Sequence, residues 1–401
     1  MAKRRIVLPT FGSLGDLHPY IAIALGLRSR GHEAILATSA CYQKKIEALG
    51  LGFRPIRPDS DFATDPAVMR RFMAFRWGLL RVGRELLGPA MRQMYKDVLR
   101  AAMDADLLVS HPLTGYVTRL VAEKTGIPWA STMITPLGFL SAYDLPIICF
   151  APTLCHAVRF LGPQCSVPLT WLFKRSTRFL AKPWYRLRAE VGLPPTSETN
   201  PLIDSHSPAL VLALFSKVLA DQQPDWPAKT VLTGFPVHDQ DGEAALPAAL
   251  SHFLEDGPPP LVFTLACSAA TVAGSFFEYS VAAAKRLGRR AVLVTGRQAC
   301  SLPSLLPDGV IACDYAPFSQ LFPRAAAVVH PGGSGTTGLA MRAGIPMLVV
   351  PYAHEHPDNA YRAVRLGIAR HLARHRYTPE RAADELRHLL DDPAYAHRAA
   401  A

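Results

Sequence analysis

Residues 328–360 read VVHPGGSGTTGLAMRAGIPMLVVPYAHEHPDNA, and this stretch decides the fold of the chain around it. An apolar run ends in a glycine-rich loop, a segment with helical character follows, and a second apolar run comes after it. This order predicts a strand, a loop, a helix at about 334–343 and a further strand, which is the repeating unit of a parallel sheet. Unpaired N–H groups and the helix dipole would make the start of that helix a site for an anion.

The loop carries residue types that suit a diphosphate. Glycines let the backbone come close to an oxygen-rich ligand, and the hydroxyl and imidazole groups add hydrogen-bond donors. The loop lacks the GK[ST] of a Walker loop and does not follow the GxGxxG dinucleotide pattern. A tight turn without a ligand stays open as the alternative. The candidate residues are His330, Gly332, Gly333, Ser334, Gly335, Thr336 and Thr337.

The same rhythm of strands and helices extends over the whole chain. RRIVLPTFGSLGDLHPYIAIALGLRSRG, at residues 4–31, reads as strand, loop and helix, and HEAILATS reads as the next strand. The rhythm restarts after residue 230. We therefore predict an α/β protein with two doubly wound, Rossmann-like domains at 1–228 and 229–401. Ligands would bind at the carboxyl ends of the strands, in a central cleft that the domains face.

Composition limits the class of protein. Of 401 residues, 49% are hydrophobic and 19% are charged, so the chain has enough apolar residues for large cores. The net charge of +11 favours anionic partners, but no block of basic residues and no nucleic-acid signature accompanies it, which argues against nucleic acid. No uncharged apolar run is long enough for a transmembrane helix. Seven scattered cysteines without a CxxC pair indicate a reducing compartment, so we expect a cytoplasmic protein.

Three stretches carry a family resemblance. YAPFSQLFPRAAAVVHPGG and the opening stretch resemble the donor-binding signature of the UDP-glycosyltransferase superfamily (glycosyltransferase family 1), which has the GT-B fold. FGSLGDLHPYIAIALGLRSRGHEAILATS resembles the start of the acceptor domain in its bacterial members. QPDWPAKTVLTGFP resembles the junction found in the branch of the rhamnosyltransferases of rhamnolipid synthesis and the sterol and macrolide enzymes. The resemblance covers residues 5 to about 392.

The resemblance implies an inverting glycosyltransferase. Such an enzyme moves a sugar from a UDP- or dTDP-sugar to a hydroxyl of a hydrophobic acceptor, such as a lipid, terpenoid, sterol or polyketide. The nucleotide sugar is a co-substrate, and no metal or other cofactor is implied. HEH at 354–356 has no clear third ligand, so it does not indicate a metal site. The alternatives are a nucleotide-sugar epimerase and a non-catalytic helper that binds a sugar nucleotide.

The resemblance also implies roles in donor binding. Tyr315 would stack on the base and the backbone of Ala316 would bind it, while Glu355 and His356 stand where the family has an Asp–Gln pair for sugar hydroxyls. Gly338 replaces a ribose-binding Glu, which makes a deoxyribose donor such as a dTDP-sugar compatible. The implied donor-binding residues are Ser268, Tyr315, Ala316, His330, Gly332, Gly333, Ser334, Gly335, Thr336, Glu355, His356 and Asn359.

The family's catalytic base stands at the position of Asp16, in the loop after the first strand. His111, at the end of a later strand, stands near the position of the residue that supports the base. We expect Asp16 to be the base and His111 its partner, which inverts the His–Asp order of plant enzymes. A general base contributes roughly 10²–10⁴-fold to the rate. Asp16 could instead cap the following helix, and His111 could be an ordinary histidine at the end of a strand.

Aromatic and apolar residues in irregular segments of the first half predict the acceptor site, because such loops carry specificity. Each of these residues is also compatible with an ordinary place in the core. The basic region 66–103 reads as helical with a break at Pro89, and it offers a peripheral contact with an anionic membrane or simply a solvated face. The candidate acceptor-binding residues are Phe72, Phe75, Met133, Phe139, Tyr143 and Ile147.

Overall fold

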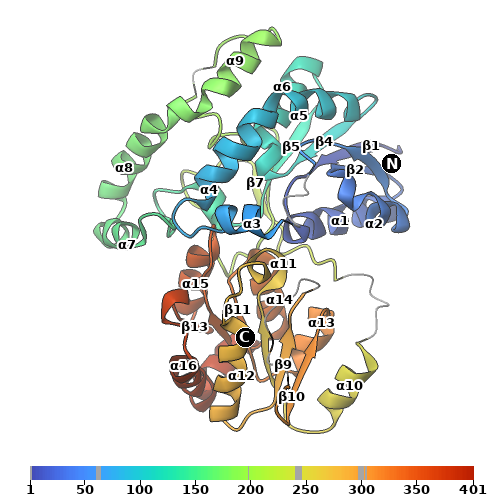
Figure 1. The fold of residues 1–401 in the computed structure, drawn as a ribbon. Coiled ribbons are helices and arrows are strands. Elements are labelled where there is room, and N and C mark those ends of the chain that lie inside the picture. The colour runs from blue at the N-terminus through green and yellow to red at the C-terminus, as the bar shows by residue number, and fades with distance from the viewer. Residues whose placement is uncertain (1, 60–64, 197, 240–245, 297–301, 303–304) are drawn as a thin grey trace. The chain divides into compact units, whose positions relative to one another are not determined.

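The computed structural model describes residues 2–401 except 60–64, 197, 240–245, 297–301 and 303–304, and for residues 66, 266 and 267 it describes the backbone alone. The chain forms two compact units. One unit consists of Met1–Asp65 and Leu79–Pro236, and the other consists of Pro66–Gly78 and Val237–Ala401. Each unit is built on its own sheet (Figure 1).

The first unit contains a seven-stranded sheet in the order β3-β2-β1-β4-β5-β6-β7. All of its strand pairs are parallel. The strands are β1 (Arg5–Pro9), β2 (Glu33–Thr38), β3 (Gly52–Pro55), β4 (Leu107–Ser110), β5 (Trp129–Met133), β6 (Val211–Ala213) and β7 (Thr230–Leu232).

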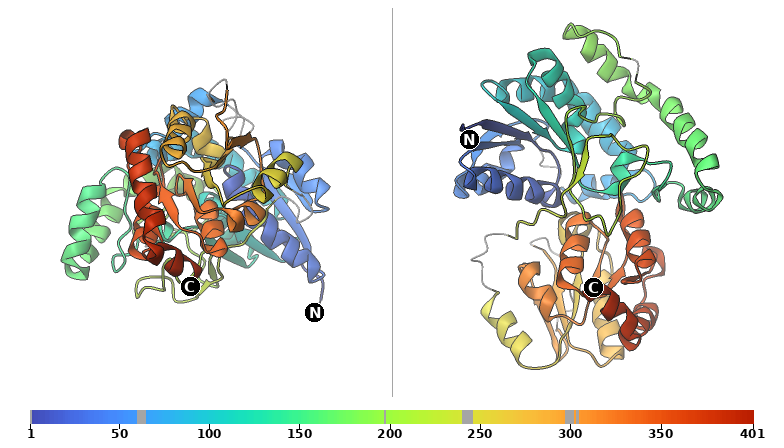
Figure 2. Two further views of the ribbon diagram at one scale, coloured as in Figure 1. Left: turned by 90° about the horizontal axis from the view of Figure 1, so that it is seen from below. Right: turned by 180° about the vertical axis from the view of Figure 1, so that it is seen from behind.

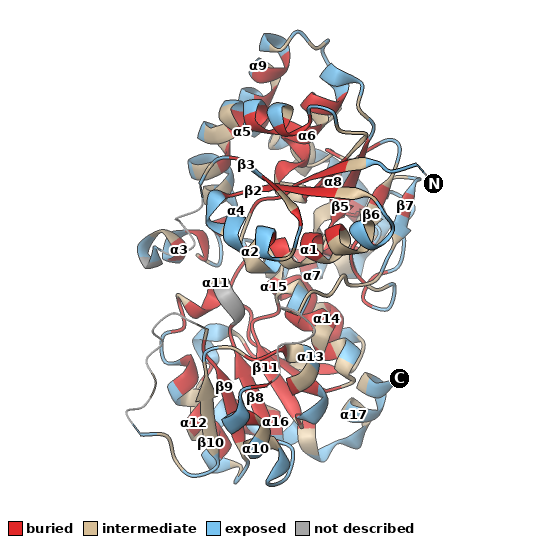
Figure 3. Cartoon of the chain, turned by 90° about the vertical axis from the view of Figure 1, so that its right-hand side faces the viewer, coloured by how far each residue is buried: buried red, intermediate tan, exposed pale blue. Residues whose placement is uncertain are grey.

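Helices cover both faces of this sheet, because its central strands are apolar on both sides. In β1, Ile6 and Leu8 pack in a cluster with the helices α1 (Leu14–Ser29) and α2 (Gln43–Ala48). Val7 points the other way, into a cluster with α5 (Gly88–Ala101) and α6 (Pro112–Thr125). The buried strands between exposed outer helix faces are visible in Figure 3.

Further helices precede α5 and fill the long connection between β5 and β6. Figures 1 and 2 show α7 and α8 as a hairpin on the outside of the first unit. The helices are α4 (Gly78–Arg81), a π-helical turn (Val82–Leu87), α7 (Pro152–Leu161), α8 (Pro163–Ser176) and α9 (Lys182–Glu190).

The second unit contains a six-stranded parallel sheet in the order β10-β9-β8-β11-β12-β13. The strands are β8 (Leu261–Thr264), β9 (Ala291–Val294), β10 (Val310–Cys313), β11 (Ala327–His330), β12 (Met347–Val349) and β13 (Ala369–His371). The helices are α3 (Pro66–Phe72), α10 (Ala248–Glu255), α11 (Ala266–Ala270), α12 (Phe276–Arg286), α13 (Phe318–Leu321), α14 (Ser334–Ala343), α15 (His356–Arg365), α16 (Pro379–Asp391) and α17 (Pro393–Ala400).

The prediction of two α/β units, each with a parallel sheet, is confirmed. The predicted break at Pro89 is wrong. Helical backbone continues from Leu87 through Gly88 into α5, and Pro89 lies in the first turn of that helix. The turn before it is π-helical, a form that occurs where a residue such as proline interrupts the ordinary hydrogen-bond ladder of an α-helix. Within the described residues, no helix combines the length and the apolar character required to cross a membrane.

Candidate functional site

Each sheet has one point at which the order of its strands reverses. In the first unit this point lies between β1 and β4, and in the second it lies between β8 and β11. Ligands of doubly wound sheets bind at the carboxyl ends of the strands beside such a point. Asp16 follows β1 and His111 follows β4, whereas His330 ends β11. The predicted catalytic pair and the predicted diphosphate loop therefore both lie at switch points.

The carboxylate of Asp16 is held by the loop that precedes it. Its Oδ2 accepts hydrogen bonds from the backbone N–H of Ser13 at 2.8 Å and from Ser13 Oγ at 3.0 Å. Ser13 is the N-cap of α1, so Asp16 does cap this helix. Gly12 has a φ of +136°, and a Cβ there would lie 2.3 Å from Asp16 Oδ2. Only glycine leaves room for the carboxylate in this position.

The other carboxylate oxygen faces His111. Asp16 Oδ1 lies 3.4 Å from His111 Nε2, and the His111 side chain is 1% exposed while that of Asp16 is 25% exposed. His111 Nδ1 accepts a hydrogen bond from the N–H of Leu113 at 3.1 Å. Because Nδ1 accepts this bond, the proton of the ring lies on Nε2, the nitrogen that faces Asp16. Asp16 is thus the accessible member of the pair.

The pKa of Asp16 reflects opposing effects. Burial acts to raise this pKa, but the neighbouring His111 and the hydrogen bonds from Ser13 hold it below its ordinary value. The carboxylate therefore stays ionised at neutral pH. An ionised, partly exposed carboxylate with a fixed donor beside it is able to accept a proton from a ligand.

In the second unit, His330 shapes the glycine-rich loop. Its Nδ1 accepts a hydrogen bond from the N–H of Gly332 at 3.1 Å, and its Nε2 lies 3.3 Å from Met347 Sδ. The side chain is fully buried, and burial lowers its pKa to about 3, so the ring is neutral. Gly332 has a φ of +97°, and a Cβ there would lie 2.9 Å from Val349 Cγ1. The loop conformation thus depends on glycine at this position.

Asn359, on α15, braces the start of α14. Its Nδ2 donates to the carbonyl of Gly332 at 2.8 Å and to Ser334 Oγ at 3.2 Å. Its Oδ1 is buried and has no hydrogen-bond partner within the described part of the chain. Thr337 Oγ1 donates to the carbonyl of Gly333 at 2.9 Å. These bonds fix the first turn of α14, whereas a Cβ on Gly335 would meet only open space.

His356 is the first residue of α15, which follows β12, and its side chain lies beside the same loop. Its Nδ1 accepts the N–H groups of Tyr352 and Ala353, both at 3.3 Å, so the proton of the neutral ring lies on Nε2. That nitrogen would lie 3.7 Å from a Cβ built on Gly333, the N-cap of α14. Burial, helped by His354 and His330, lowers the pKa of His356 to about 3. His356 thus presents an uncharged N–H beside the helix start.

The remaining predicted donor-binding residues lie on the same edge of the second sheet. Ser268 lies on α11 after β8, and its carbonyl accepts a hydrogen bond from Thr271 Oγ1 at 2.8 Å. Tyr315 and Ala316 follow β10, with Ala316 buried in the core. Glu355 is the N-cap of α15. Thr336 is a buried residue in the first turn of α14.

The predicted acceptor-binding residues fall into two groups. Met133, Phe139 and Ile147 are buried in the first unit, and Tyr143 there is 46% exposed. Phe139 stacks on Trp226, with 4.0 Å between ring centroids. Phe72 and Phe75 instead belong to the 66–78 segment of the second unit, where Phe72 is buried and Phe75 is 39% exposed. The sequence could not show that residues 66–78 join the second unit, because in chain order they lie between two segments of the first unit.

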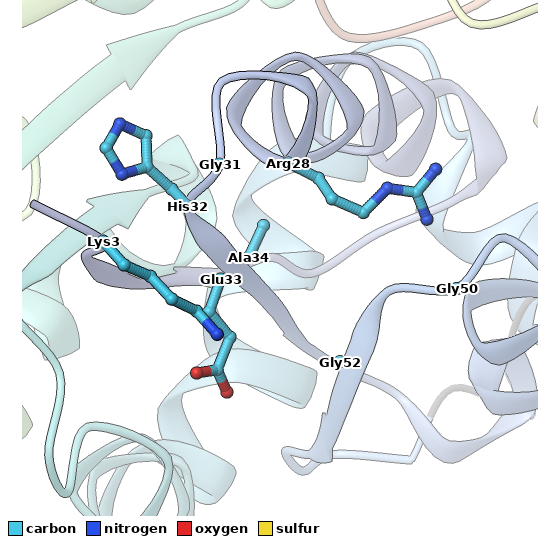
Figure 4. A pocket seen from close by; sticks show the side chains of 8 residues that line it. All are labelled: Lys3, Arg28, Gly31, His32, Glu33, Ala34, Gly50 and Gly52. Atoms are coloured by element: carbon cyan, nitrogen blue, oxygen red, sulfur yellow. The ribbon is translucent and has the colours of Figure 1, made fainter. Parts of the chain in front are cut away.

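A hollow of about 370 Å³ lies elsewhere on the first unit (Figure 4). Lys3, His32, Glu33 and Gly52 are among the residues that line it. Glu33 begins β2, so this hollow opens at the amino end of that strand and contains none of the predicted site residues. Within the described residues, no three His, Cys, Asp or Glu side chains form a group able to hold a metal ion.

Sequence reasoning did not single out Gly12 and Ser13 as parts of the site. The quoted loop FGSLGD contains both, and the Ser-x-x-Asp spacing of a capping box was the available signal. It did not reveal that the cap and the His111 contact use different oxygens of one carboxylate. That division depends on the adjacency of β1 and β4, which only the folded sheet shows.

Comparison with known proteins follows the same division of the chain. A family model for the "Glycosyltransferase family 28 N-terminal domain" matches residues 6–136. A second model, "Erythromycin biosynthesis protein CIII-like, C-terminal domain", matches residues 280–401. The glycosyltransferase VinC, solved in complex with dTDP, superposes with a TM-score of 0.67 at 21% identity, covering 98% of this chain and 93% of that one. This structural likeness establishes the GT-B fold that the sequence predicts.

Relatives extend over nearly the whole chain. O-mycaminosyltylonolide 6-deoxyallosyltransferase of Streptomyces fradiae is 36% identical over 411 residues, covering 98% of this chain and 92% of the relative. Sterol 3-beta-glucosyltransferase UGT80A2 of Arabidopsis thaliana is 26% identical, covering 88% of this chain and 55% of the relative. With such a relative along its full length and the GT-B architecture in both halves, this chain belongs to the GT-B glycosyltransferases and is itself a glycosyltransferase.

Proposed function

We propose that this enzyme transfers a sugar, with inversion at the anomeric carbon, from a dTDP- or UDP-sugar to a hydroxyl of an apolar acceptor. The observation that carries the mechanism is the ionised carboxylate of Asp16, one oxygen of which faces His111. The first unit would bind the acceptor and the second the donor. We place the boundary between these domains after Pro236, because β7 still pairs with the first sheet.

The hydrogen bonds of Asp16 leave room for one more donor. A carboxylate has about four acceptor positions, and the N–H and the hydroxyl of Ser13 occupy two of them, both on Oδ2. The acceptor hydroxyl would donate to Oδ1, which lies 3.4 Å from His111 Nε2. As that oxygen bonds to the anomeric carbon and the bond to the diphosphate breaks, its proton passes to Asp16. His111 would hold and orient the carboxylate rather than take the proton itself.

The start of α14 would bind the donor's diphosphate. Its unpaired N–H groups and dipole favour an anion and stabilise the charge of the leaving nucleotide. His356 Nε2–H lies beside the N-cap and would add an uncharged donor there. His330 has both ring nitrogens turned to protein atoms, so we assign it the positioning of the loop. Glu355 remains the candidate for sugar hydroxyls, and Tyr315 for the base.

A deoxyribose nucleotide is the donor we favour. Gly338 stands where a ribose-binding Glu would be, so the hydroxyl that distinguishes UDP from dTDP lacks that partner. VinC, with 21% identity, was solved in complex with dTDP, which is consistent with this choice. We propose a cytoplasmic location, which is supported by the absence of disulfides among the described cysteines Cys41, Cys149, Cys155, Cys165 and Cys313.

For the acceptor we propose a macrolide-type polyketide, with a sterol as the second candidate. The first class follows from the name of the 36% identical relative and the second from the 26% identical sterol 3-beta-glucosyltransferase. Met133, Phe139, Tyr143 and Ile147 are our candidates for the apolar acceptor site in the first unit. Phe72 and Phe75 would reach an acceptor only from the second unit's 66–78 segment.

The test is the release of nucleoside diphosphate from a panel of dTDP- and UDP-sugars, with macrolide aglycones and sterols as acceptors. We expect Asp16→Asn to lower kcat by roughly 10²–10⁴-fold, since Asn still accepts from Ser13 but cannot take the proton. Asp104→Asn changes an 85% exposed aspartate of the same unit and should leave the rate unchanged. Turnover of Asp16→Asn within about twofold of the parent would exclude Asp16 as the base. Isomerised sugar formed from donor alone would instead indicate an epimerase.

A further inference from the structure

The hairpin of α7 and α8 exposes much apolar surface. Of the twenty large hydrophobic side chains that the described structure leaves exposed, ten lie within residues 150–180. Phe160 is 91% exposed, Leu154 62%, Phe179 62% and Trp171 53%. Single exposed apolar residues are ordinary, but a gathering of this kind marks an interaction surface. Phe160 and Leu161 stand at the tip, where Gly162 joins the two helices with a φ of +78°.

The same segment is strongly basic. Residues 145–189 contain seven Lys and Arg and no Asp or Glu. Three of the seven cations bind carboxylates from other segments: Arg159 pairs with Asp144, Lys174 with Asp204 and Arg188 with Glu123. The other four have no ion pair with a described carboxylate and are Arg175, Arg178, Lys182 and Arg186. Besides Arg92, Arg186 lies close enough to Glu190 to lower the pKa of that carboxyl, but the segment as a whole carries an excess of positive charge.

One cation and two apolar side chains share the outer side of α8. Ser166 and Thr170 are buried, and Ser166 Oγ bonds to the carbonyl of Ala142, so their side of the helix faces the protein. Val167, Trp171 and Arg175 are spaced four residues apart and are all exposed, which places them on one outer face. The Arg175 guanidinium lies over the Trp171 ring at 5.7 Å. Large apolar side chains with Trp and Arg on one helix face are typical of a helix that lies in a membrane interface.

We propose that the α7–α8 hairpin docks this enzyme on the surface of an anionic lipid bilayer. The apolar side chains would enter the boundary between headgroups and acyl chains, while Arg175 on α8 binds lipid phosphates, helped by Arg178, Lys182 and Arg186 just beyond the end of α8. A second copy of the chain suits this surface less well, because pairing two copies of the hairpin would place their positive charges against each other. The basic region 66–103 is also less suitable, since Arg100 there pairs with Asp97, and Arg92 pairs with Glu190.

Docking on a bilayer would also bring the enzyme close to an apolar acceptor, and this consequence rests on the proposed function. Apolar macrolides and sterols partition into bilayers, so a docked enzyme would meet its acceptor at a raised local concentration. Lipid binding itself does not depend on that function. The surface is therefore testable without any knowledge of the substrate.

The experiment measures co-sedimentation of the full chain with vesicles of pure phosphatidylcholine and of phosphatidylcholine with 30% phosphatidylglycerol. We expect binding to the anionic vesicles that weakens with salt. The double variant Phe160→Ser, Trp171→Ser should reduce binding by roughly tenfold or more. Arg175→Gln with Lys182→Gln should cost roughly fivefold for each charge. Met103→Ser and Lys44→Gln remove an exposed apolar residue and an exposed cation outside the hairpin, and should change nothing.

Light scattering and a sugar-transfer assay without lipid complete the test. We expect a monomer whose transfer to a soluble acceptor is the same in parent and hairpin variants. Equal binding to both kinds of vesicle, or binding that the hairpin variants retain, would overturn the proposal. So would a dimer that the hairpin variants dissociate, because the hairpin would then be a protein interface. Failure of sugar transfer with intact lipid binding would concern the proposed function alone.

Discussion

At the scale of single residues, Asp16 combines two roles that the sequence presented as alternatives. Its Oδ2 caps α1 through Ser13, and its Oδ1 faces His111. The cap holds the carboxylate in place and, by lowering its pKa, keeps it ionised at neutral pH, although it also makes the carboxylate a weaker base. The candidate residues themselves were accessible to sequence reasoning, because His111 directly follows an apolar strand and Asp16 lies just after the loop that follows another. Their separate roles could not be predicted. They depend on the hydrogen bond from the N–H of Leu113 to Nδ1 of His111, which leaves Nε2 to face Asp16.

The pH dependence of the reaction tests this division. Burial raises the pKa of Asp16, and His111 and Ser13 together lower it below its ordinary value. Removing the contribution of His111 therefore moves the pKa of Asp16 upward, and the rate falls off at a higher pH on the acidic side. His111→Asn retains a side-chain acceptor for Leu113 N–H at the start of α6 but is too short to reach Asp16. We expect the acidic limb of kcat/KM to shift to higher pH in this variant.

The control for that profile is Thr114→Ser, a conservative change next to the cap that leaves the Asp16–His111 contact in place. Its acidic limb should coincide with that of the parent. If His111→Asn lowers the rate but leaves the limb where it was, His111 does not act through the ionisation of Asp16.

At the scale of elements, two glycines near the start of α14 differ in whether the fold requires them. Gly332 must be glycine because of its positive φ and the nearness of Val349 and the carbonyl of His356. Gly335 has no such constraint, because a Cβ there meets open space. A glycine that the fold does not require, on the helix turn where an anion is expected, suits close approach of a ligand.

The two glycines should therefore respond to alanine in opposite ways. We expect Gly332→Ala to lower the free energy of unfolding by about 1–3 kcal/mol through backbone strain and crowding. Gly335→Ala should leave that free energy unchanged or raise it by up to about 1 kcal/mol, since alanine favours the helix. In the donor assay, however, Gly335→Ala should raise the dissociation constant of the nucleotide sugar about tenfold or more, measured by calorimetry. Unchanged donor affinity in Gly335→Ala would place the diphosphate elsewhere.

The prediction of helices and strands was accurate where a segment had a strongly periodic apolar pattern and a clear signal for its first residue. The helix expected at about 334–343 is Ser334–Ala343, because Gly333 and Gly344 bound it. The short strands β3, β7 and β13 were not predicted. Each lies at an edge of its sheet and has only three or four residues, too few for a periodic signal. Their strand conformation comes from pairing with a neighbour, which is a tertiary effect.

At the scale of the whole molecule, the two units have separate cores. The clusters around β1 and β4 consist of residues of the first unit, and the cluster around Val262, Val292 and Val328 consists of residues of the second. A ligand that binds one unit should stabilise that unit more than the other, so a single two-state transition is not expected for this chain.

Calorimetric unfolding with nucleotides tests where the donor binds. At about 100 times Kd, a ligand stabilises its site by about 2.7 kcal/mol, which corresponds to roughly 5–10 °C in Tm for a unit of this size. We expect dTDP to shift one transition by this amount, UDP to shift it less and GDP not at all. Gly335→Ala should abolish most of the dTDP shift. An equal response to all three nucleotides would argue against recognition of the base by the Tyr315 region.

The order of apolar runs, glycine loops and helix signals along this chain was sufficient to predict two α/β units and the loops at the carboxyl ends of their strands, while the family resemblance supplied most of the candidate residues. These are local properties, since they depend on the chemistry of neighbours in sequence. Tertiary structure alone decided that Asp16 and His111 meet, that residues 66–78 join the second unit, and that the α7–α8 hairpin is uncovered. Each of these depends on which segments distant in sequence become neighbours, and that is determined by strand order and packing rather than by any one stretch of residues.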